Sequence, residues 1–94
     1  MAVNMQGMDV GEVQRIGRQM QVESDNLGQL LARVRNQVSV AEQNWHGSDA
    51  SHFVDEWASR QQQLQTLQDS LRRFGQRAVD EAAQQSRASG TATA

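Results

Sequence analysis

The sequence predicts an all-α protein: an antiparallel helix-turn-helix hairpin that dimerises into a four-helix bundle. Apolar residues recur at steps of three and four through two long segments, which is the spacing of amphipathic helices. The chain of 94 residues contains no proline to interrupt either segment. The tripeptide Trp45-His46-Gly47 stands where the first segment ends and the second begins. The expected organisation is a flexible arm over 1–8, a hairpin domain over 9–85 (helix 9–45, turn 46–48, helix 49–85) and a disordered tail over 86–94.

The first helix carries a heptad seam that begins at Val10. Only Gly17 and Ser24 interrupt its apolar positions, and Trp45 occupies the last one. Such a seam packs against a second helix because it gathers apolar surface into one stripe. The residues expected in the core or at a partner interface are Val13, Met20, Leu27, Leu31, Val34 and Val38.

The same spacing resumes after the turn at Ala50 and continues to Ala78. The expected core or partner-interface residues of the second helix are Phe53, Trp57, Leu64, Leu67, Leu71 and Phe74. Arg60 is the one charged residue in this seam. A cation at such a position must reach an acid or a carbonyl, or extend its head into water. We therefore interpret Arg60 as a candidate determinant of pairing specificity.

The turn is marked by Gly47, because a helix commonly ends in a left-handed conformation that only glycine adopts without steric cost. Ser48 or Asp49 is expected to cap the second helix through a side-chain oxygen. We expect the Trp45 indole to close the end of the hairpin by packing, with its outer edge available for recognition.

A short connection pairs positions whose numbers sum to about 93 in the two antiparallel helices. This register predicts that Phe74 faces the helical turn that begins at Gly17. Leu67 or Leu71 is expected to face Ser24. Large residues would then meet small ones, as close packing requires.

The hairpin is expected to need a partner, because a chain of this length buries a modest share of its apolar surface alone. Glycines inside the first helix add a cost of up to about 1 kcal/mol each relative to alanine. Further apolar residues flank the two seams: Ile16, Leu30, Val40, Val54 and Ala58. They widen the stripe beyond what one helix can cover, which favours a second hairpin. The alternative is that they are scattered surface residues of the ordinary kind.

Trp45-x-Gly47 at the middle of a helical chain without proline or cysteine, with a small residue at Ala50, resembles the WXG family. These are early-secreted-antigen-like small substrates of type VII (ESX-like) secretion systems. The resemblance covers nearly the whole helical region and carries over residue by residue onto Trp45 and Gly47. It implies a non-enzymatic protein that forms one half of a helical dimer and is recognised by the secretion ATPase complex. It also implies a cytoplasmic protein that is secreted without a cleavable signal peptide.

One feature departs from that family. Exported pairs carry, on at least one partner, a tyrosine followed four residues later by an acid, and this chain contains no tyrosine. We expect a heterodimer whose second hairpin supplies this signal, with a homodimer as the alternative. A second class of function also remains open: a cytosolic adaptor that homodimerises or clasps a partner helix without being exported.

Other sites are disfavoured by the sequence. His46, Asp49 and His52 surround the turn, but their spacing lacks the i, i+4 pairing of helical metal ligands, which favours solvated turn residues. No nucleophile motif is present, so we expect neither an enzyme nor a cofactor. The net charge of −2 and the lack of aromatic residues among Arg72, Arg73 and Arg77 argue against nucleic acid. No stretch has the length of a membrane span or the pattern of a secretory signal.

Overall fold

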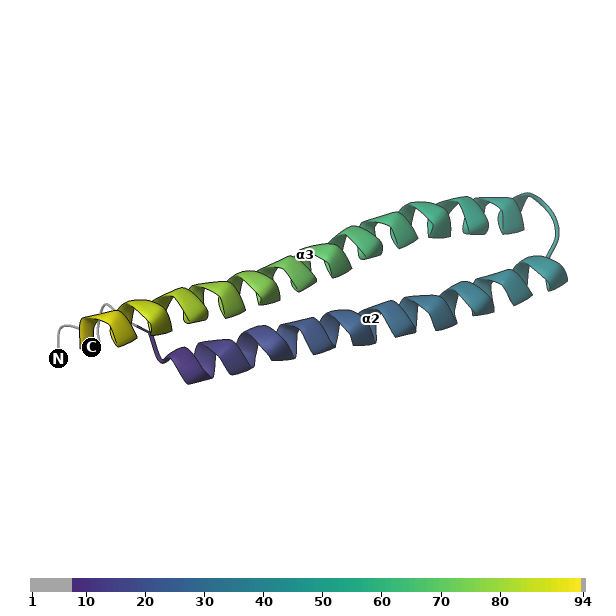
Figure 1. Ribbon diagram of the computed structural model, residues 1–94. Helices are drawn as coiled ribbons and strands as arrows, with labels where there is room; N and C mark the ends of the chain where they lie inside the picture. Colours follow the sequence, from purple (N-terminus) through teal and green to yellow (C-terminus); the bar gives the residue numbers. More distant parts are fainter. Residues whose placement is uncertain (1–7, 94) are drawn as a thin grey trace. The chain divides into compact units, whose positions relative to one another are not determined.

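The computed structural model describes residues 8–93, and the side chains of residues 8–88. Within that range the chain is a helical hairpin of two helices: α2, Val10–Asn44, and α3, Ser48–Thr93 (Figure 1). Residues 45–47 connect them. This confirms the predicted all-α hairpin. The pairing of two hairpins into a four-helix bundle stays a prediction.

The start of α2 is capped by Asp9. Its side-chain Oδ1 accepts a hydrogen bond from the Glu12 amide at 3.1 Å, and its carbonyl accepts one from the Val13 amide at 2.9 Å. Aspartate is among the best N-cap residues because its oxygen satisfies an amide that has no partner within the helix. The helix therefore begins one residue after the expected boundary.

The two ends of α3 differ from expectation. The helix begins at Ser48, where the Ser51 amide donates to the Gly47 carbonyl at 3.1 Å, so Gly47 holds the cap position expected at Ser48 or Asp49.

At its other end α3 continues to Thr93, and residues 86–93 are helical where a disordered tail was expected. The expected arm over 1–8 lies outside the described residues except for Met8, which precedes α2.

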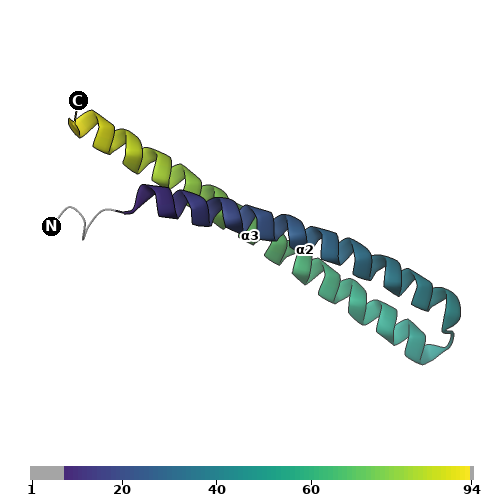
Figure 2. The same cartoon turned by 90° about the horizontal axis from the view of Figure 1, so that it is seen from below.

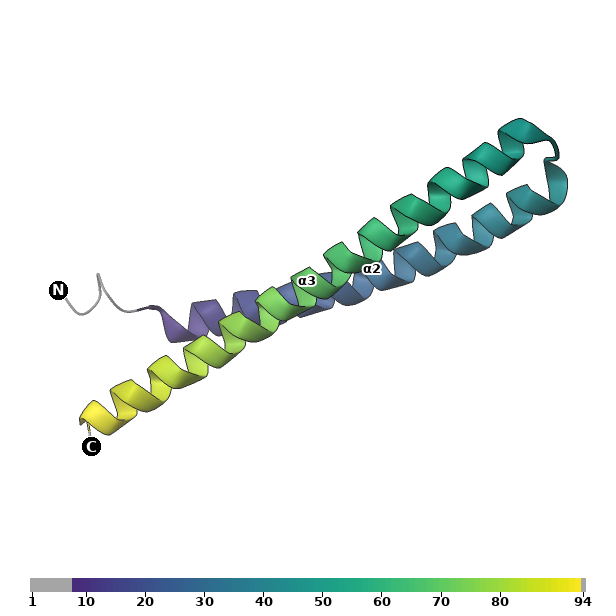
Figure 3. The same cartoon turned by 90° about the horizontal axis from the view of Figure 1, so that it is seen from above.

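The hairpin forms two compact units, which we call unit 1 and unit 2. Unit 2 is Ser24–Ser70 and contains the turn. Its α2 and α3 segments run antiparallel and side by side from the connection (Figures 1 and 3). The buried apolar side chains of this unit are Leu31, Val38 and Ala50.

Unit 1 holds, of the described residues, 8–23 and 71–93. The start of α2 and the end of α3 run in opposite directions in this unit (Figure 2). Ala82 is its fully buried apolar side chain, and Gly17 and Gly75 are buried with it. Both units thus hold their helices together over a narrow seam built partly from small residues.

Candidate interaction surface

The seam expected on α2 lies on the face that packs against α3. Leu31 and Val38 are buried. The other expected residues are half-buried: Val13, Met20, Leu27 and Val34. Gly17 and Ser24, the small residues that interrupt the seam, are buried as well.

The seam of α3 differs from the expected one at alternate positions. Trp57, Leu64 and Leu71 are half-buried. The intervening residues instead face outward: Phe53, Leu67 and Phe74 are 42%, 57% and 59% exposed, and the Arg60 side chain is 63% exposed. The seam instead contains the next residue in the sequence after each of these four exposed residues: Val54, Gln61, Gln68 and Gly75.

Polar and small groups on α2 explain this shift of one residue. Ser24 is fully buried, and its Oγ donates a hydrogen bond to the Gln68 carbonyl at 3.0 Å. Gln61, with its amide oxygen turned towards Arg35, accepts from the guanidinium Nε at 2.7 Å. Burying a hydroxyl without a partner is costly, so a face of α3 that satisfies the Ser24 hydroxyl is preferred to one that buries more apolar surface.

The expected helix register is close to the observed one, but the residues in contact are different. In unit 1, Gly17 faces Gly75, and not Phe74 as predicted. In unit 2, Ser24 bonds to Gln68, and not to Leu67 or Leu71. In unit 1 the expectation that a large residue fills the gap beside Gly17 is therefore wrong: Gly17 meets Gly75, and the helix backbones approach closely.

The hairpin has two flanks that differ in chemistry. One flank is formed by residues that follow seam residues. It carries the Gln21–Gln76 hydrogen bond of 2.8 Å in unit 1 and the contact between Gly28 and the Gln68 side chain in unit 2. The opposite flank is formed by residues that come one position before a seam residue in the sequence. Both helices are right-handed and they run antiparallel. Within each unit, the residues before the seam residues of α2 and those before the seam residues of α3 therefore lie on the same side of the helix pair.

We call the large apolar residues of this second flank the apolar flank. In unit 1 they are Ile16 and Phe74, and in unit 2 they are Leu30, Phe53 and Leu67. Each precedes a seam residue, and each is between 42% and 59% exposed. Val22 and Val40 are also exposed and lie two residues beyond Met20 and Val38, and Val40 also precedes the half-buried Ala41 near the end of α2. The apolar flank is the largest set of exposed apolar side chains with a common position on the helices, which marks it as the candidate interaction surface.

Arg60 lies on the apolar flank of unit 2, outside the seam where it was expected. Its guanidinium nitrogen is 3.8 Å from the Glu56 carboxylate one turn earlier. Both side chains are mostly exposed, so this ion pair contributes little to stability. The charge is therefore available to a partner as well as to its own helix.

The Trp45 side chain lies beyond the end of α2, at the turn, and does not complete the seam. It is 44% exposed, and its ring centroid is 5.3 Å from that of Phe53 in a tilted arrangement. Gly47 has a φ of 114°, the positive value expected from the sequence. The aromatic pair continues the apolar flank of unit 2 to the turn.

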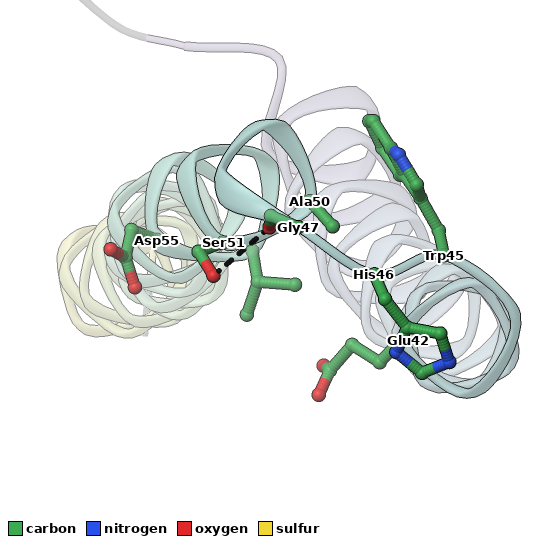
Figure 4. Close-up of a pocket in the computed structure, with 8 residues that line it drawn as sticks. Glu42, Trp45, His46, Gly47, Ala50, Ser51 and Asp55 are labelled. Atoms are coloured by element: carbon green, nitrogen blue, oxygen red, sulfur yellow. Dashed lines mark hydrogen bonds between the residues drawn. The ribbon is translucent and has the colours of Figure 1, made fainter.

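The turn also borders an open hollow of about 320 Å³ in unit 2. Figure 4 shows Glu42 and His46 on one side of it, with the Trp45 indole directed away from the Glu42 carboxylate. Ser51 donates its hydroxyl to the Gly47 carbonyl at 3.3 Å there. Among residues 8–93 no group of three or more histidine and carboxylate side chains is placed to hold a metal ion.

Exposed ion pairs lie along both helices. Arg15 donates to both carboxylate oxygens of Glu12, and this hydrogen bond, together with the positive charge, lowers the pKa of Glu12 below its ordinary value. Arg77 pairs with Glu81 at 3.0 Å, one turn further along α3. Neither described helix has an apolar stretch long enough to cross a membrane.

Comparison of the chain with protein-family models, with curated proteins and with solved structures gave no significant match. The function of the protein is therefore inferred from its own residues. Sequence reasoning missed Gln61, Gln68 and Gly75 as seam residues because it followed hydrophobicity alone. Gly17 on α2 is the signal for Gly75 and Arg35 is the signal for Gln61, whereas Gln68 meets Ser24 through its backbone carbonyl, which no side-chain pattern marks.

Proposed function

We propose that this protein is a non-enzymatic binding module of the WXG kind, which acts as one half of a helical dimer. In this role it is a substrate or co-substrate of a type VII secretion system. The observation that carries the proposal is the apolar flank, whose five large side chains stay exposed in the hairpin. Trp45 and Gly47 at the turn add the motif that such proteins share.

The energetics of the hairpin support a partner. Burying apolar surface is the main favourable term in folding and in most protein association. In the described residues the fully or nearly buried apolar side chains are few and half of them are alanine: Leu31, Val38, Ala50 and Ala82. A second hairpin that covered the apolar flank would add the larger side chains to a shared core, as in a four-helix bundle.

The partner and the route follow from the same proposal. The dimer is formed with a second WXG-type hairpin, either a companion that carries the tyrosine–acid signal or a second copy of the chain. The assembled dimer is then bound by the secretion ATPase complex and leaves the cytoplasm without a cleavable signal peptide. The half-exposed Trp45 indole, held against Phe53, is the group we assign to recognition at the turn.

The absence of tyrosine favours one alternative. A hairpin without the export signal can serve as a cytosolic adaptor that uses the apolar flank to dimerise or to clasp a partner helix. This alternative keeps the binding surface and removes the transport step.

Export is tested by producing the chain in its own host with and without a working type VII ATPase. We expect the protein in the culture medium only when the ATPase is active, together with a similar-sized companion if the dimer is mixed. A cytosolic marker protein measured in the same medium controls for lysis. Retention inside cells that export other type VII substrates would favour the adaptor.

Recognition at the turn is tested with Trp45→Ala in the same assay. We expect export to fall while the purified variant keeps its helical content. Val40→Ala is the matched control, because Val40 is also an exposed apolar residue of unit 2 but lies away from the turn aromatic pair. Equal export of the two variants would remove Trp45 from the proposal.

A further inference from the structure

We propose that the α3 segment of unit 2 has a second rotational setting about its own axis, and that the Ser24 hydroxyl holds it in the observed one. In the second setting Phe53 and Leu67 turn into the seam, so the part of the apolar flank that α3 contributes to unit 2 is covered. The inference rests on the proposed function for the use of this surface, and deepens it by naming what keeps the surface exposed.

The α3 sequence of unit 2 offers two seams that share their central residues. Trp57 and Leu64 belong to both seams and are half-buried in the structure. The observed seam is completed by three other half-buried residues: Val54, Gln61 and Gln68. The second seam is completed by the residues one position earlier in the sequence: Phe53, Arg60 and Leu67.

Hydrophobic burial favours the second seam. Phe53 and Leu67 are 42% and 57% exposed in the observed setting. In the second setting they replace the smaller Val54 and the polar side chain of Gln68. Free energy is gained roughly in proportion to the apolar area removed from water, so the rotation is favourable for these side chains.

The rotation between the two settings is small. Successive residues of an α-helix are about 100° apart around the axis, and the two seams differ at every second seam residue, so α3 turns by about 50°. Because Cα atoms lie about 2.3 Å from the helix axis, this rotation moves the backbone by about 2 Å. The two helices keep their register, since the rotation requires no sliding along the axis.

The Ser24 hydroxyl opposes this rotation. Ser24 is fully buried, and its Oγ donates a hydrogen bond to the Gln68 carbonyl at 3.0 Å. A backbone shift of about 2 Å breaks a hydrogen bond of this length and leaves the hydroxyl buried without a partner, which is costly. A bond to the backbone, unlike a bond to a side chain, fixes the rotation of the helix itself.

Arg60 also favours the observed setting. Its side chain is 63% exposed, and its guanidinium nitrogen is 3.8 Å from the Glu56 carboxylate. In the second seam the arginine stem is covered and its charged head has to extend into water. The second setting therefore gains apolar burial and loses polar contacts, and the observed setting does the reverse.

A conflict between the apolar stripe of a helix and the face that it buries is expected where two arrangements lie close in free energy. The aromatic pair at the turn is linked to this choice, because Phe53 packs on Trp45 with ring centroids 5.3 Å apart. Turning Phe53 into the seam alters that contact. The Trp45 indole therefore reports on the rotation of α3.

The second setting is tested by relaxation-dispersion NMR of the purified full chain, which detects minor states that exchange in microseconds to milliseconds. The probes are the Leu67 methyl groups and the Trp45 indole N–H. We expect exchange at both probes, unchanged on dilution because the rotation occurs within one chain. The Val22 methyl groups, which are exposed on the α2 segment of unit 1, are the internal control and should show no exchange.

Two substitutions should move the equilibrium in opposite directions, as read at the Trp45 indole. Ser24→Ala removes the hydroxyl and should raise the minor population about fivefold, the ratio that corresponds to one net hydrogen bond. Leu67→Gln removes apolar surface from the second seam and should lower the minor population about fivefold. Ser39→Ala, at an exposed position of α2 in unit 2, is the control and should match the parent. Circular dichroism of each variant verifies that the hairpin is intact.

Three results would overturn the inference: no exchange at either probe in the parent and in Ser24→Ala, a minor population that either substitution leaves unchanged, or exchange that grows with protein concentration. The last result would mean that association of chains covers the flank. A chain without the exchange that is still exported would refute the rotation alone. A chain that shows the exchange but stays inside cells would refute export alone.

Discussion

Gly17 and Gly75 face each other across unit 1 so closely that neither position has room for a side chain. A Cβ built on Gly17 would lie 2.7 Å from the Gly75 carbonyl oxygen, and one built on Gly75 would lie 2.6 Å from the Gly17 carbonyl oxygen. Backbone atoms cannot move aside as a flexible side chain can. These two glycines therefore set the distance between α2 and α3 in this unit.

Gly17→Ala should destabilise the hairpin. Inserting a methyl group into a tight contact typically costs about 1–3 kcal/mol, which outweighs the gain of up to about 1 kcal/mol in helix propensity. Urea denaturation followed by circular dichroism measures the difference. Gly11→Ala is the matched control, because its Cβ would meet only Asp9 Oδ1 at 3.8 Å, and it should stabilise the protein.

Gly28→Ala should behave differently from Gly17→Ala, although the new Cβ would lie 2.5 Å from an atom. That atom is the Gln68 Nε2, the far end of a flexible side chain, which can rotate away. The gain in helix propensity should then leave the free energy of unfolding unchanged or higher. A loss as large as that of Gly17→Ala would mean that the Gln68 side chain is fixed in place.

The contrast between these glycines indicates what the sequence predicts and what it does not. Heptad spacing predicted the α2 seam, because burial of one helix face imposes a periodic pattern of apolar residues. The turn was predicted at Gly47, because a helix often ends in a backbone conformation that favours glycine. The α3 face depends on how two surfaces fit. Phe74 is the more apolar choice, but Gly75 fits beside Gly17, and only the pair of helices reveals that preference.

The apolar flank shows the same limit. The sequence indicated too much apolar surface for one seam, and the structure divides that surface between a seam and a flank. Leu67 and Phe74 were expected in the core or at an interface, and they lie exposed beside a seam that contains Gln68 and Gly75. A periodic pattern predicts which side of a helix is apolar. Which residues on that side are buried against the other helix depends on how the two helices fit together.

Ser24→Ala should lower stability by about 1 kcal/mol, the net value of a typical hydrogen bond. Ser24 is fully buried, and its hydroxyl donates to the Gln68 carbonyl at 3.0 Å. Thermal unfolding would measure the loss, with Ser39→Ala as the control because Ser39 is exposed on α2. If both variants unfold at the same temperature, the buried hydroxyl contributes nothing to the pairing of the helices.

The pKa of Glu12 should depend on Arg15. The Arg15 hydrogen bond, and then its positive charge, lowers the pKa of Glu12 in the folded protein. The pair therefore stabilises the fold above the ordinary carboxyl range, and this contribution disappears as the pH falls through the lowered pKa. Arg15→Gln should raise the Glu12 pKa towards its ordinary value in an NMR titration of the side-chain carboxyl. Arg18→Gln should not move it, and an equal response to both variants would contradict the specific pair.

Gly47→Ala should destabilise the hairpin through the backbone alone. The φ of 114° is strained for any L-residue, yet a Cβ at this position would meet no atom within 4 Å. The expected loss is about 1–3 kcal/mol, the typical cost of holding a residue in a sparsely populated conformation. Chemical synthesis of the chain with D-alanine at the same position supplies the matched control, because a D-residue adopts positive φ readily and adds the same methyl group. We expect the D-alanine protein to be at least as stable as the parent. If both alanine proteins lost stability equally, the methyl group and not the backbone conformation would be responsible, and the turn would have to be more crowded than the structure shows.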